Sequence, residues 1–130
     1  MGNILIIEDN KIFADDIAFF VEDEGHKCTV YNSTDQVIKN WDSVGKFDVI
    51  ILDLMMRIEN LLQPNDDEVN LDTGEILFNK ILAGFPNKRI IIVTAKTPDE
   101  IEIDTKQKNV QVINKPFNDE KIKLLLDLLG

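Results

Sequence analysis

Three acidic residues in this sequence stand directly behind short runs of aliphatic residues. Glu8 and Asp9 follow residues 4–7 (ILII), and Asp53 follows residues 49–52 (VIIL). A carboxylate in such apolar surroundings is costly unless it is paired or bound to a metal. Carboxylate oxygens suit Mg²⁺, which takes few ligands from the protein and keeps several waters. If the fold brings the three acids together, their mutual repulsion predicts a site for a divalent cation.

Two more polar residues follow aliphatic runs in the same way. Thr94 comes after residues 90–93, and Lys115 comes just after residues 110–113. A metal and a lysine around one reachable carboxylate suit phosphoryl transfer, which needs positioning and neutralisation of negative oxygens more than covalent assistance. An aspartate can be the nucleophile of such a reaction and form an acyl phosphate. This chemistry explains Asp53 as an ionised phosphoryl acceptor with an apolar strand behind it.

The aliphatic runs also predict the elements that hold these residues. Most of the runs are continuous and β-branched, which is typical of strands buried on both faces of a parallel sheet. The weaker run 27–31 alternates and indicates an edge strand. Strand and helix patterns alternate five times, so we predict a doubly wound α/β fold with three layers and right-handed crossovers. Ligands bind beyond the carboxyl ends of such strands, which is where the polar residues fall.

Helix patterns lie between the predicted strands. Residues 13–21 have helical spacing, and Ser33 with Gln36 forms a capping box for one helix whose apolar stripe runs over residues 37–44. Three further helices are predicted from their caps, beginning at Asp72, at Thr97 and after Asn118. The helix after Thr97 has few apolar residues, so we expect it to be short or mobile.

One connection is longer than a compact fold needs. Residues 56–71 separate the third strand from the third helix, whereas a few residues suffice in most βα units. We expect residues 63–68 to form an exposed acidic loop, and Ile58, Leu61 and Leu62 suit one amphipathic turn. Two hypotheses stay open for this extended loop: a lid or partner-recognition element over the site, and a plain surface loop.

The overall composition limits the classes of function. With 24 acidic and 14 basic residues the net charge is −10, which argues against general nucleic-acid binding. One cysteine, Cys28, excludes an internal disulfide and fits a reducing compartment, and one histidine, His26, argues against a histidine metal site or a catalytic triad. No run approaches the roughly 18 consecutive apolar residues of a membrane span. We expect a single soluble, cytoplasmic domain over residues 1–130, without direct contact with nucleic acid or membrane.

Taken together, the motifs resemble the receiver domain of two-component response regulators. The segments that carry the resemblance are ILIIEDN (4–10), DVIILDLMM (48–56), IIIVTA (90–95) and NKPF (114–117), and it covers essentially the whole chain. The resemblance implies the flavodoxin-like (βα)5 fold, with a five-stranded parallel sheet in the order 2-1-3-4-5. It also implies that this chain is a phosphoprotein of phosphorelay signalling.

What the resemblance implies for the metal site follows residue by residue. Asp53 matches the aspartate that is phosphorylated. Asp9 matches a direct ligand of Mg²⁺, and Glu8 matches an acid that acts on the metal through water. The backbone carbonyl of Met55 matches the third ligand from the protein.

The same resemblance implies the remaining roles and the partners. Thr94 matches the hydroxyl that moves to contact the phosphoryl group, and Lys115 matches the lysine that pairs with a phosphoryl oxygen. The donor would be a phosphohistidine on a sensor histidine kinase or a phosphotransfer protein, and a downstream protein would read the modified form. The chain would be a stand-alone receiver, monomeric or weakly dimeric. It would not be an enzyme beyond catalysing its own phosphorylation and dephosphorylation.

This sequence departs from the family pattern at three places. Val112 stands where the family usually has Tyr or Phe, three residues before the lysine. Gly74 matches a glycine just inside the third helix, which makes the preceding connection longer than usual. The stretch 95–110 lacks the usual Ala- and Gly-rich ending of the fourth helix.

Three other functions were weighed. Because Val112 departs from the family pattern, one alternative hypothesis stays open: a receiver-like module that is never phosphorylated and serves only as an interaction partner. A phosphatase with an aspartate nucleophile commonly needs another aspartate two residues on, where this chain has Met55. A nucleotide or flavin binder would want Gly, Ser or Thr after the first strand, where Glu8 and Asp9 would repel phosphate.

Overall fold

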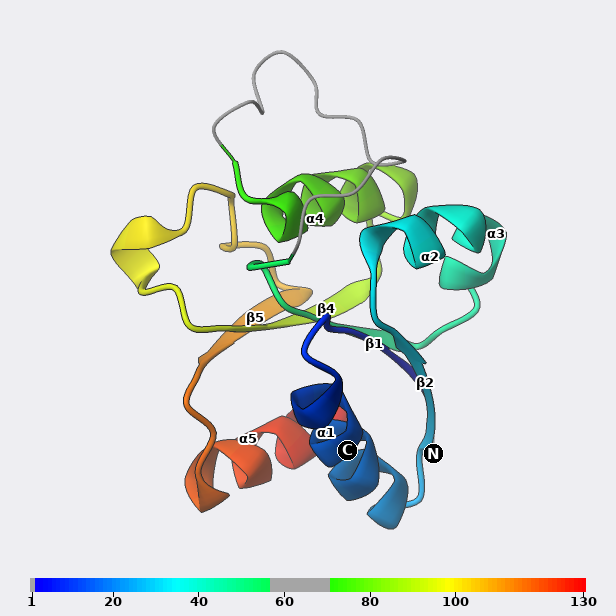
Figure 1. The fold of residues 1–130 in the computed structure, drawn as a ribbon, viewed down its shortest axis with the longest axis vertical. Helices are drawn as coiled ribbons and strands as arrows, with labels where there is room; N and C mark the ends of the chain where they lie inside the picture. Colours follow the sequence, from blue (N-terminus) through cyan, green and yellow to red (C-terminus); the bar gives the residue numbers. More distant parts are fainter. Residues whose placement is uncertain (1, 57–70) are drawn as a thin grey trace.

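The computed structural model describes residues 2–56 and 71–130 of the chain. Its five parallel strands form one sheet in the order β2-β1-β3-β4-β5, which confirms the predicted fold class and strand order (Figure 1). The strands are β1 (Asn3–Ile7), β2 (Lys27–Tyr31), β3 (Val49–Leu52), β4 (Arg89–Thr94) and β5 (Val110–Asn114). Strand β2 lies at an edge, as its alternating pattern predicts.

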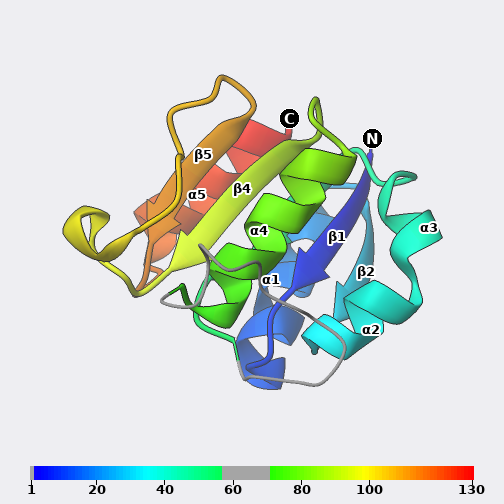
Figure 2. The same cartoon turned by 90° about the horizontal axis from the view of Figure 1, so that it is seen from above.

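Helices cover both faces of the sheet. Helices α1 and α5 lie on one face, and α2, α3 and α4 lie on the other (Figure 1). Figure 2 shows α4 over the middle of the sheet, α2 and α3 toward the β2 edge, and the β4–β5 connection at the opposite edge. The helices are α1 (Lys11–Asp23), α2 (Thr34–Lys39), α3 (Trp41–Val44), α4 (Thr73–Gly84) and α5 (Asp119–Leu129).

The two faces of the sheet carry two separate apolar cores. Successive side chains of a strand point to opposite faces, so the continuous aliphatic runs supply both cores. Leu5 and Ile7 belong to the core under α4, whereas Ile4 and Ile6 belong to the core under α1 and α5. This two-sided burial is the physical reason that the strands read as unbroken apolar runs.

The register of the strands sets where the polar residues emerge. Ile7 pairs with Leu52, so Glu8 and Asp53 follow paired positions of the neighbouring strands β1 and β3. The backbone N–H of Asp53 continues this pairing and donates to the carbonyl of Ile7 at 3.1 Å. On the other side, Thr94 pairs with Asn114 across β4 and β5, directly before Lys115.

The predicted second helix is broken into two. Asn40 separates α2 from α3, and its side chain donates to the carbonyl of Gln36 at 2.8 Å. This local bond competes with the helical ladder, which explains the interruption within residues 37–44. The cap differs in part as well: the backbone N–H of Gln36 donates to Ser33 Oγ as predicted, but the Gln36 side chain accepts from the N–H of Asn32.

The predicted fourth helix is reduced to one turn. Thr97 and Glu100 do form the predicted capping box, but only the 3₁₀ turn Pro98–Glu100 follows it. Ile101 and Ile103 then run on without regular structure and pack against the core under α4. The few apolar residues of this stretch are therefore spaced for an extended segment and not for a helix face.

Several smaller predictions have definite outcomes. Cys28 lies in β2, where burial and, to a smaller extent, the charge of Glu22 raise the pKa of its thiol to about 11, so the thiol stays protonated and unreactive. His26 is half-buried, and its Nδ1 accepts from the N–H of Gly2 at 3.1 Å, which gives this single histidine a structural contact. The extended loop over residues 56–71 falls almost entirely outside the described residues. None of the helices in the described ranges has the length and apolar character needed to cross a bilayer.

Glycine is required at residue 74, where α4 meets the end of β3. A Cβ added there would lie 2.4 Å from the backbone oxygens of Asp53 and Leu54. Gly74→Ala is therefore expected to lower the free energy of unfolding by about 1–3 kcal/mol or more, because backbone atoms cannot yield as a flexible side chain would. Urea unfolding measures this loss. Gly130→Ala is the matched control, since its added Cβ meets nothing closer than 3.4 Å, and equal unfolding midpoints for the two variants would contradict the account.

Candidate functional site

Glu8, Asp9 and Asp53 form one acidic cluster at the carboxyl ends of β1 and β3. Their ligand oxygens all lie within 4.8 Å of one another. Glu8 and Asp53 are 2% and 5% exposed, whereas Asp9 is half-buried. Three carboxylates this close, two of them out of water, repel each other strongly unless positive charge joins them. Among the described residues, no other group of three possible metal ligands comes together in this way.

Lys115, which directly follows β5, brings positive charge to the cluster. Its Nζ lies 2.7 Å from Glu8 Oε1 and 3.4 Å from Asp53 Oδ2. The same ammonium lies 4.2 Å from the ring centroid of Phe13, which is a cation–π distance. The sequence predicts Phe13 only as part of the helical pattern over residues 13–21. Its contact with Lys115 is not predicted and is found only in the structure.

The pKa of Glu8 reflects these surroundings. The pKa of its carboxyl is raised to about 7, chiefly by burial, with the hydrogen bond from Lys115 opposing the rise and the charge of Asp53 adding to it. The backbone N–H of Asn10 donates to Glu8 Oε2 at 3.1 Å and also favours the ionised form. The single charge of Lys115 does not compensate all three acids, so Glu8 is only partly ionised near neutral pH.

Asp53 is held by the chain that follows it. The backbone N–H of Met55 donates to Asp53 Oδ1 at 3.1 Å, which leaves Oδ2 facing Lys115. A hollow of about 290 Å³ lined by Asp9, Met55, Met56 and Asp72 opens beside the cluster. Asp53 itself is 5% exposed and both of its carboxylate oxygens have partners, so the hollow reaches the cluster through Asp9 and Met55.

Thr94 lies at the same edge of the sheet, where its hydroxyl is engaged by the backbone that follows it. Its side chain is fully buried, and its Oγ1 accepts a hydrogen bond from the backbone N–H of Lys96 at 3.1 Å. The backbone carbonyl of Thr94 in turn accepts from the N–H of Lys115 at 2.8 Å. The hydroxyl and the lysine are therefore tied to each other through the backbone.

The donor chemistry of the cluster fits Mg²⁺. The three side chains offer only oxygen atoms, which a hard cation prefers, and the half-buried Asp9 leaves room for the waters that Mg²⁺ keeps. A divalent cation would supply the positive charge that Lys115 alone does not. Softer metals, which favour thiolate or imidazole ligands, find none at this cluster.

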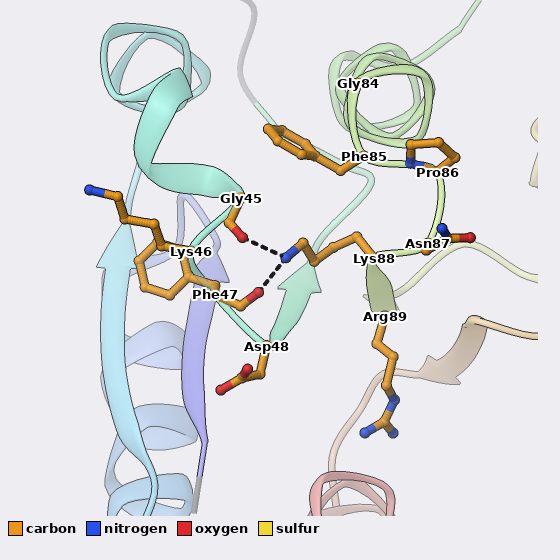
Figure 3. Close-up of a pocket in the computed structure, with 10 residues that line it drawn as sticks. All are labelled: Gly45, Lys46, Phe47, Asp48, Gly84, Phe85, Pro86, Asn87, Lys88 and Arg89. Carbon is orange, nitrogen blue, oxygen red and sulfur yellow. Dashed lines mark hydrogen bonds between the residues drawn. The ribbon is translucent and has the colours of Figure 1, made fainter.

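A second hollow lies at the other end of the sheet and has a different character. It measures about 510 Å³ and lies between the segments 45–48 and 84–89 (Figure 3). Lys88 crosses it and donates its Nζ to the backbone carbonyls of Gly45 and Phe47. The side chains of Lys46 and Arg89 point away from Lys88 (Figure 3). The basic side chains that line this hollow do not converge on one point, so we interpret Lys88 as a structural link between two turns.

Comparisons with known proteins agree with this geometry. A family model described as the response regulator receiver domain matches residues 4–127. The sensory transduction protein RegX3 of Mycobacterium tuberculosis is 36% identical over 56 residues, which are 43% of this chain and 24% of the length of that protein. The RegX3 of Mycobacterium bovis matches equally well. The match to these relatives is thus confined to about a quarter of their length.

Solved structures show the same fold. A response regulator receiver domain protein of Bacillus halodurans superposes with a TM-score of 0.74 at 16% identity, over 98% of this chain and 96% of that one. The response regulator TrrA of Thermotoga maritima, solved in complex with Mg²⁺-BeF, gives a TM-score of 0.73 at 19% identity over 100% of both chains. At these identities the likeness establishes the arrangement of the elements and leaves the chemistry to the residues themselves.

Proposed function

The chain belongs to the response regulator receiver domain family, and from that premise we propose that it accepts a phosphoryl group on Asp53. The donor is a phosphohistidine of a sensor histidine kinase or a phosphotransfer protein, and the transfer depends on Mg²⁺. The observation that carries the proposal is the convergence of Glu8, Asp9 and Asp53 within 4.8 Å, beside Lys115. The phosphorylated form signals through altered contacts with a downstream protein.

The metal site of this proposal consists of the acidic cluster and one backbone group. Asp9 and Asp53 bind Mg²⁺ directly, Glu8 acts through a water, and the carbonyl of Met55 is the remaining ligand from the protein. Mg²⁺ bound there would neutralise negative charge on the transferring group and stabilise the transition state by roughly several kcal/mol. Support comes from the all-oxygen donor set and from the excess of negative charge that Lys115 leaves uncompensated.

The transfer step assigns a role to each remaining residue. A carboxylate oxygen of Asp53 attacks phosphorus, the P–N bond to the donor histidine breaks, and its electron pair stays on the histidine nitrogen. Lys115, already 3.4 Å from Asp53 Oδ2, pairs with a phosphoryl oxygen and offsets the added negative charge. Thr94 releases the N–H of Lys96 and turns its hydroxyl toward another phosphoryl oxygen.

The donor needs a surface beside the site on which to dock. Two large apolar side chains that follow acids of the cluster along the chain are open to solvent: Ile12, three residues after Asp9, is 78% exposed, and Met55, two residues after Asp53, is 52% exposed. We assign them to the contact with the phosphohistidine-bearing partner, because each follows an acid of the cluster closely along the chain and exposes an apolar side chain. A kinase that couples to such a receiver works in the cytoplasm, where we also place this chain.

A mass measurement tests the proposed function. The chain is incubated with Mg²⁺ and acetyl phosphate, a small acyl phosphate donor, and weighed intact. The expected result is one added phosphoryl group that survives acid and is lost in base, as an acyl phosphate is. Steady hydrolysis of p-nitrophenyl phosphate would favour a phosphatase instead, and a chain that stays unmodified in Mg²⁺ would favour the receiver-like interaction module.

The raised pKa of Glu8 predicts how magnesium binding depends on pH. Protonation of Glu8 removes one negative charge that attracts Mg²⁺ and its water, so the affinity for Mg²⁺ is expected to rise as the pH increases through about 7 and to level off above it. In the absence of metal, the free energy of unfolding changes with pH in the opposite direction. Glu8 ionises near 4.5 in the unfolded chain and near 7 in the folded chain, so this group makes the free energy of unfolding fall as the pH rises between those values.

Titration calorimetry in buffers of different ionisation enthalpy measures both the affinity and the protons released on binding. The wild-type chain is expected to release protons at pH values below about 7 and progressively fewer above. In Glu8→Gln, which cannot ionise, the proton release and the pH-dependent rise in affinity should both disappear. An affinity for Mg²⁺ that stays flat across this range in the wild type would refute the role given to Glu8.

A further inference from the structure

Glu75 is a fully buried carboxylate that the chemistry above does not use. It lies in the first turn of α4, with an exposed fraction of 0%, among the apolar residues of that helix. A buried charge is stable only when hydrogen bonds and an opposite charge compensate it. A helix cap alone does not require such burial, because the capping partner Asp72 is exposed.

Three donors satisfy Glu75, and two of them come from the connection between β4 and β5. Its Oε1 accepts from the N–H of Asp72 at 3.1 Å and from Lys96 Nζ at 2.8 Å. Its Oε2 accepts from the backbone N–H of Glu102 at 2.7 Å. This one carboxylate therefore fastens the segment 96–102 to the start of α4, where the chain has a single 3₁₀ turn in place of a helix.

Lys96 is fixed at both its ends. Its ammonium is 2.8 Å from Asp72 Oδ2 as well as from Glu75, and its side chain is only 11% exposed. Burial alone would lower the pKa of Lys96, but the hydrogen bonds to Asp72 and Glu75 outweigh it and raise the pKa. The backbone N–H of the same residue donates to Thr94 Oγ1, the hydroxyl that is to turn toward the phosphoryl group.

A continuous chain of contacts thus runs from the acidic site to the outer edge of the sheet. It passes from the hydroxyl of Thr94 to the backbone of Lys96, from its ammonium to Glu75, and from Glu75 to the backbone of Glu102. Glu102 lies between Ile101 and Ile103, which pack on the core together with Val112. The ammonium of Lys96 contacts Asp72 and Glu75 together, so losing one of these contacts while keeping the other would be a discrete rearrangement.

We propose that the Glu75–Lys96 ion pair couples phosphorylation of Asp53 to the segment 97–106, with Glu75 acting as a positioning residue through Lys96. This inference rests on the proposed function, since it needs Thr94 to leave the N–H of Lys96 when the phosphoryl group arrives. Release of that N–H frees the backbone of Lys96, loosens the hold of Glu75 on Glu102, and changes the surface formed by residues 97–106.

Hydrogen–deuterium exchange of the full chain tests this coupling. Exchange is followed by mass spectrometry in peptides covering residues 97–106, with Mg²⁺ alone and with Mg²⁺ plus beryllofluoride, which stands in for the phosphoryl group. Fluorine NMR on the same samples reports independently whether beryllofluoride is bound. The wild type is expected to bind it and to exchange faster at residues 97–106 than with Mg²⁺ alone.

Three variants separate coupling from a merely structural role. In Glu75→Gln, residues 97–106 should exchange fast in both states, so the response to beryllofluoride is lost while the bound fluorine signal remains. The double variant Glu75→Leu with Lys96→Met should behave alike, and it guards against misfolding because replacing a buried ion pair by apolar groups is often neutral for stability. Glu102→Gln is the matched control: its side chain is exposed and its backbone donor is unchanged, so its response should equal that of the wild type.

The outcomes that overturn the inference are distinct from those that overturn the proposed function. Bound beryllofluoride without any change at residues 97–106 in the wild type contradicts the coupling. So does a response of wild-type size in both Glu75 variants. Absence of a bound fluorine signal in the wild type removes the proposed function itself, and the coupling with it.

Discussion

Replacing Asp53 by asparagine is expected to abolish phosphorylation of the chain by acetyl phosphate. Asparagine keeps the shape of the side chain but has no nucleophilic carboxylate oxygen to form the bond to phosphorus. Because Asp53 is 5% exposed and lies against Lys115 and Glu8, the loss of its charge should also relieve repulsion within the cluster. The variant should therefore stay folded, and intact mass spectrometry should detect no added phosphoryl group under conditions that modify the wild type fully.

The control for this experiment is Asp23→Asn. Asp23 is an exposed aspartate at the carboxyl end of α1, away from the acidic cluster, so its replacement changes the net charge equally. This variant should gain the phosphoryl group as the wild type does. If Asp53→Asn still gained it, the acceptor would be another residue and the proposed chemistry of the site would be wrong.

Replacing Asp9 by asparagine is expected to weaken Mg²⁺ binding by at least about tenfold, since even residues that only support a metal ligand contribute that much. Asp9 is the half-buried member of the cluster and borders the hollow beside Asp53, so it is the acid best placed to share a metal with water. The rate of phosphorylation at limiting Mg²⁺ should fall with the affinity, and saturating Mg²⁺ should restore part of it.

Calorimetric titration with Mg²⁺ measures the affinity, and Asp15→Asn supplies the comparison. Asp15 lies on the exposed face of α1, close to Asp9 along the chain but outside the acidic cluster, so it probes the general effect of one lost negative charge. Its replacement should leave the affinity within a small factor of the wild type. Equal losses in the two variants would mean that Mg²⁺ responds to net charge and not to a built site.

The sequence predicts the fold because its strands are buried on both faces. Unbroken aliphatic runs such as residues 49–52 leave few alternatives to a parallel sheet, and the polar residue that ends each run then falls at one edge. The convergence of Glu8, Asp9 and Asp53 follows from this register, and the structure bears it out as geometry. The order of the strands came from the resemblance, since the pattern of residues alone does not determine which strands are neighbours.

Two other features could not be predicted from apolar periodicity and helix caps, because each depends on particular side-chain hydrogen bonds. The break at Asn40 results from a side chain bonding to its own helix, which apolar periodicity does not register. The burial of Glu75 depends on Lys96 and on the backbone of Glu102, which are far from it in the sequence. A glutamate three residues after Asp72 reads as a capping residue, and that interpretation is correct but incomplete.

The interpretation as a whole depends on Asp53 becoming an acyl phosphate in the presence of Mg²⁺. The most direct test treats the wild-type chain with Mg²⁺ and acetyl phosphate, reduces the product with borohydride, which converts a phosphorylated aspartate to homoserine, and locates the change by tandem mass spectrometry. The account predicts homoserine at residue 53, dependent on Mg²⁺ and confined to that position. Homoserine at another aspartate, or an unchanged residue 53 in a chain saturated with Mg²⁺, would contradict it.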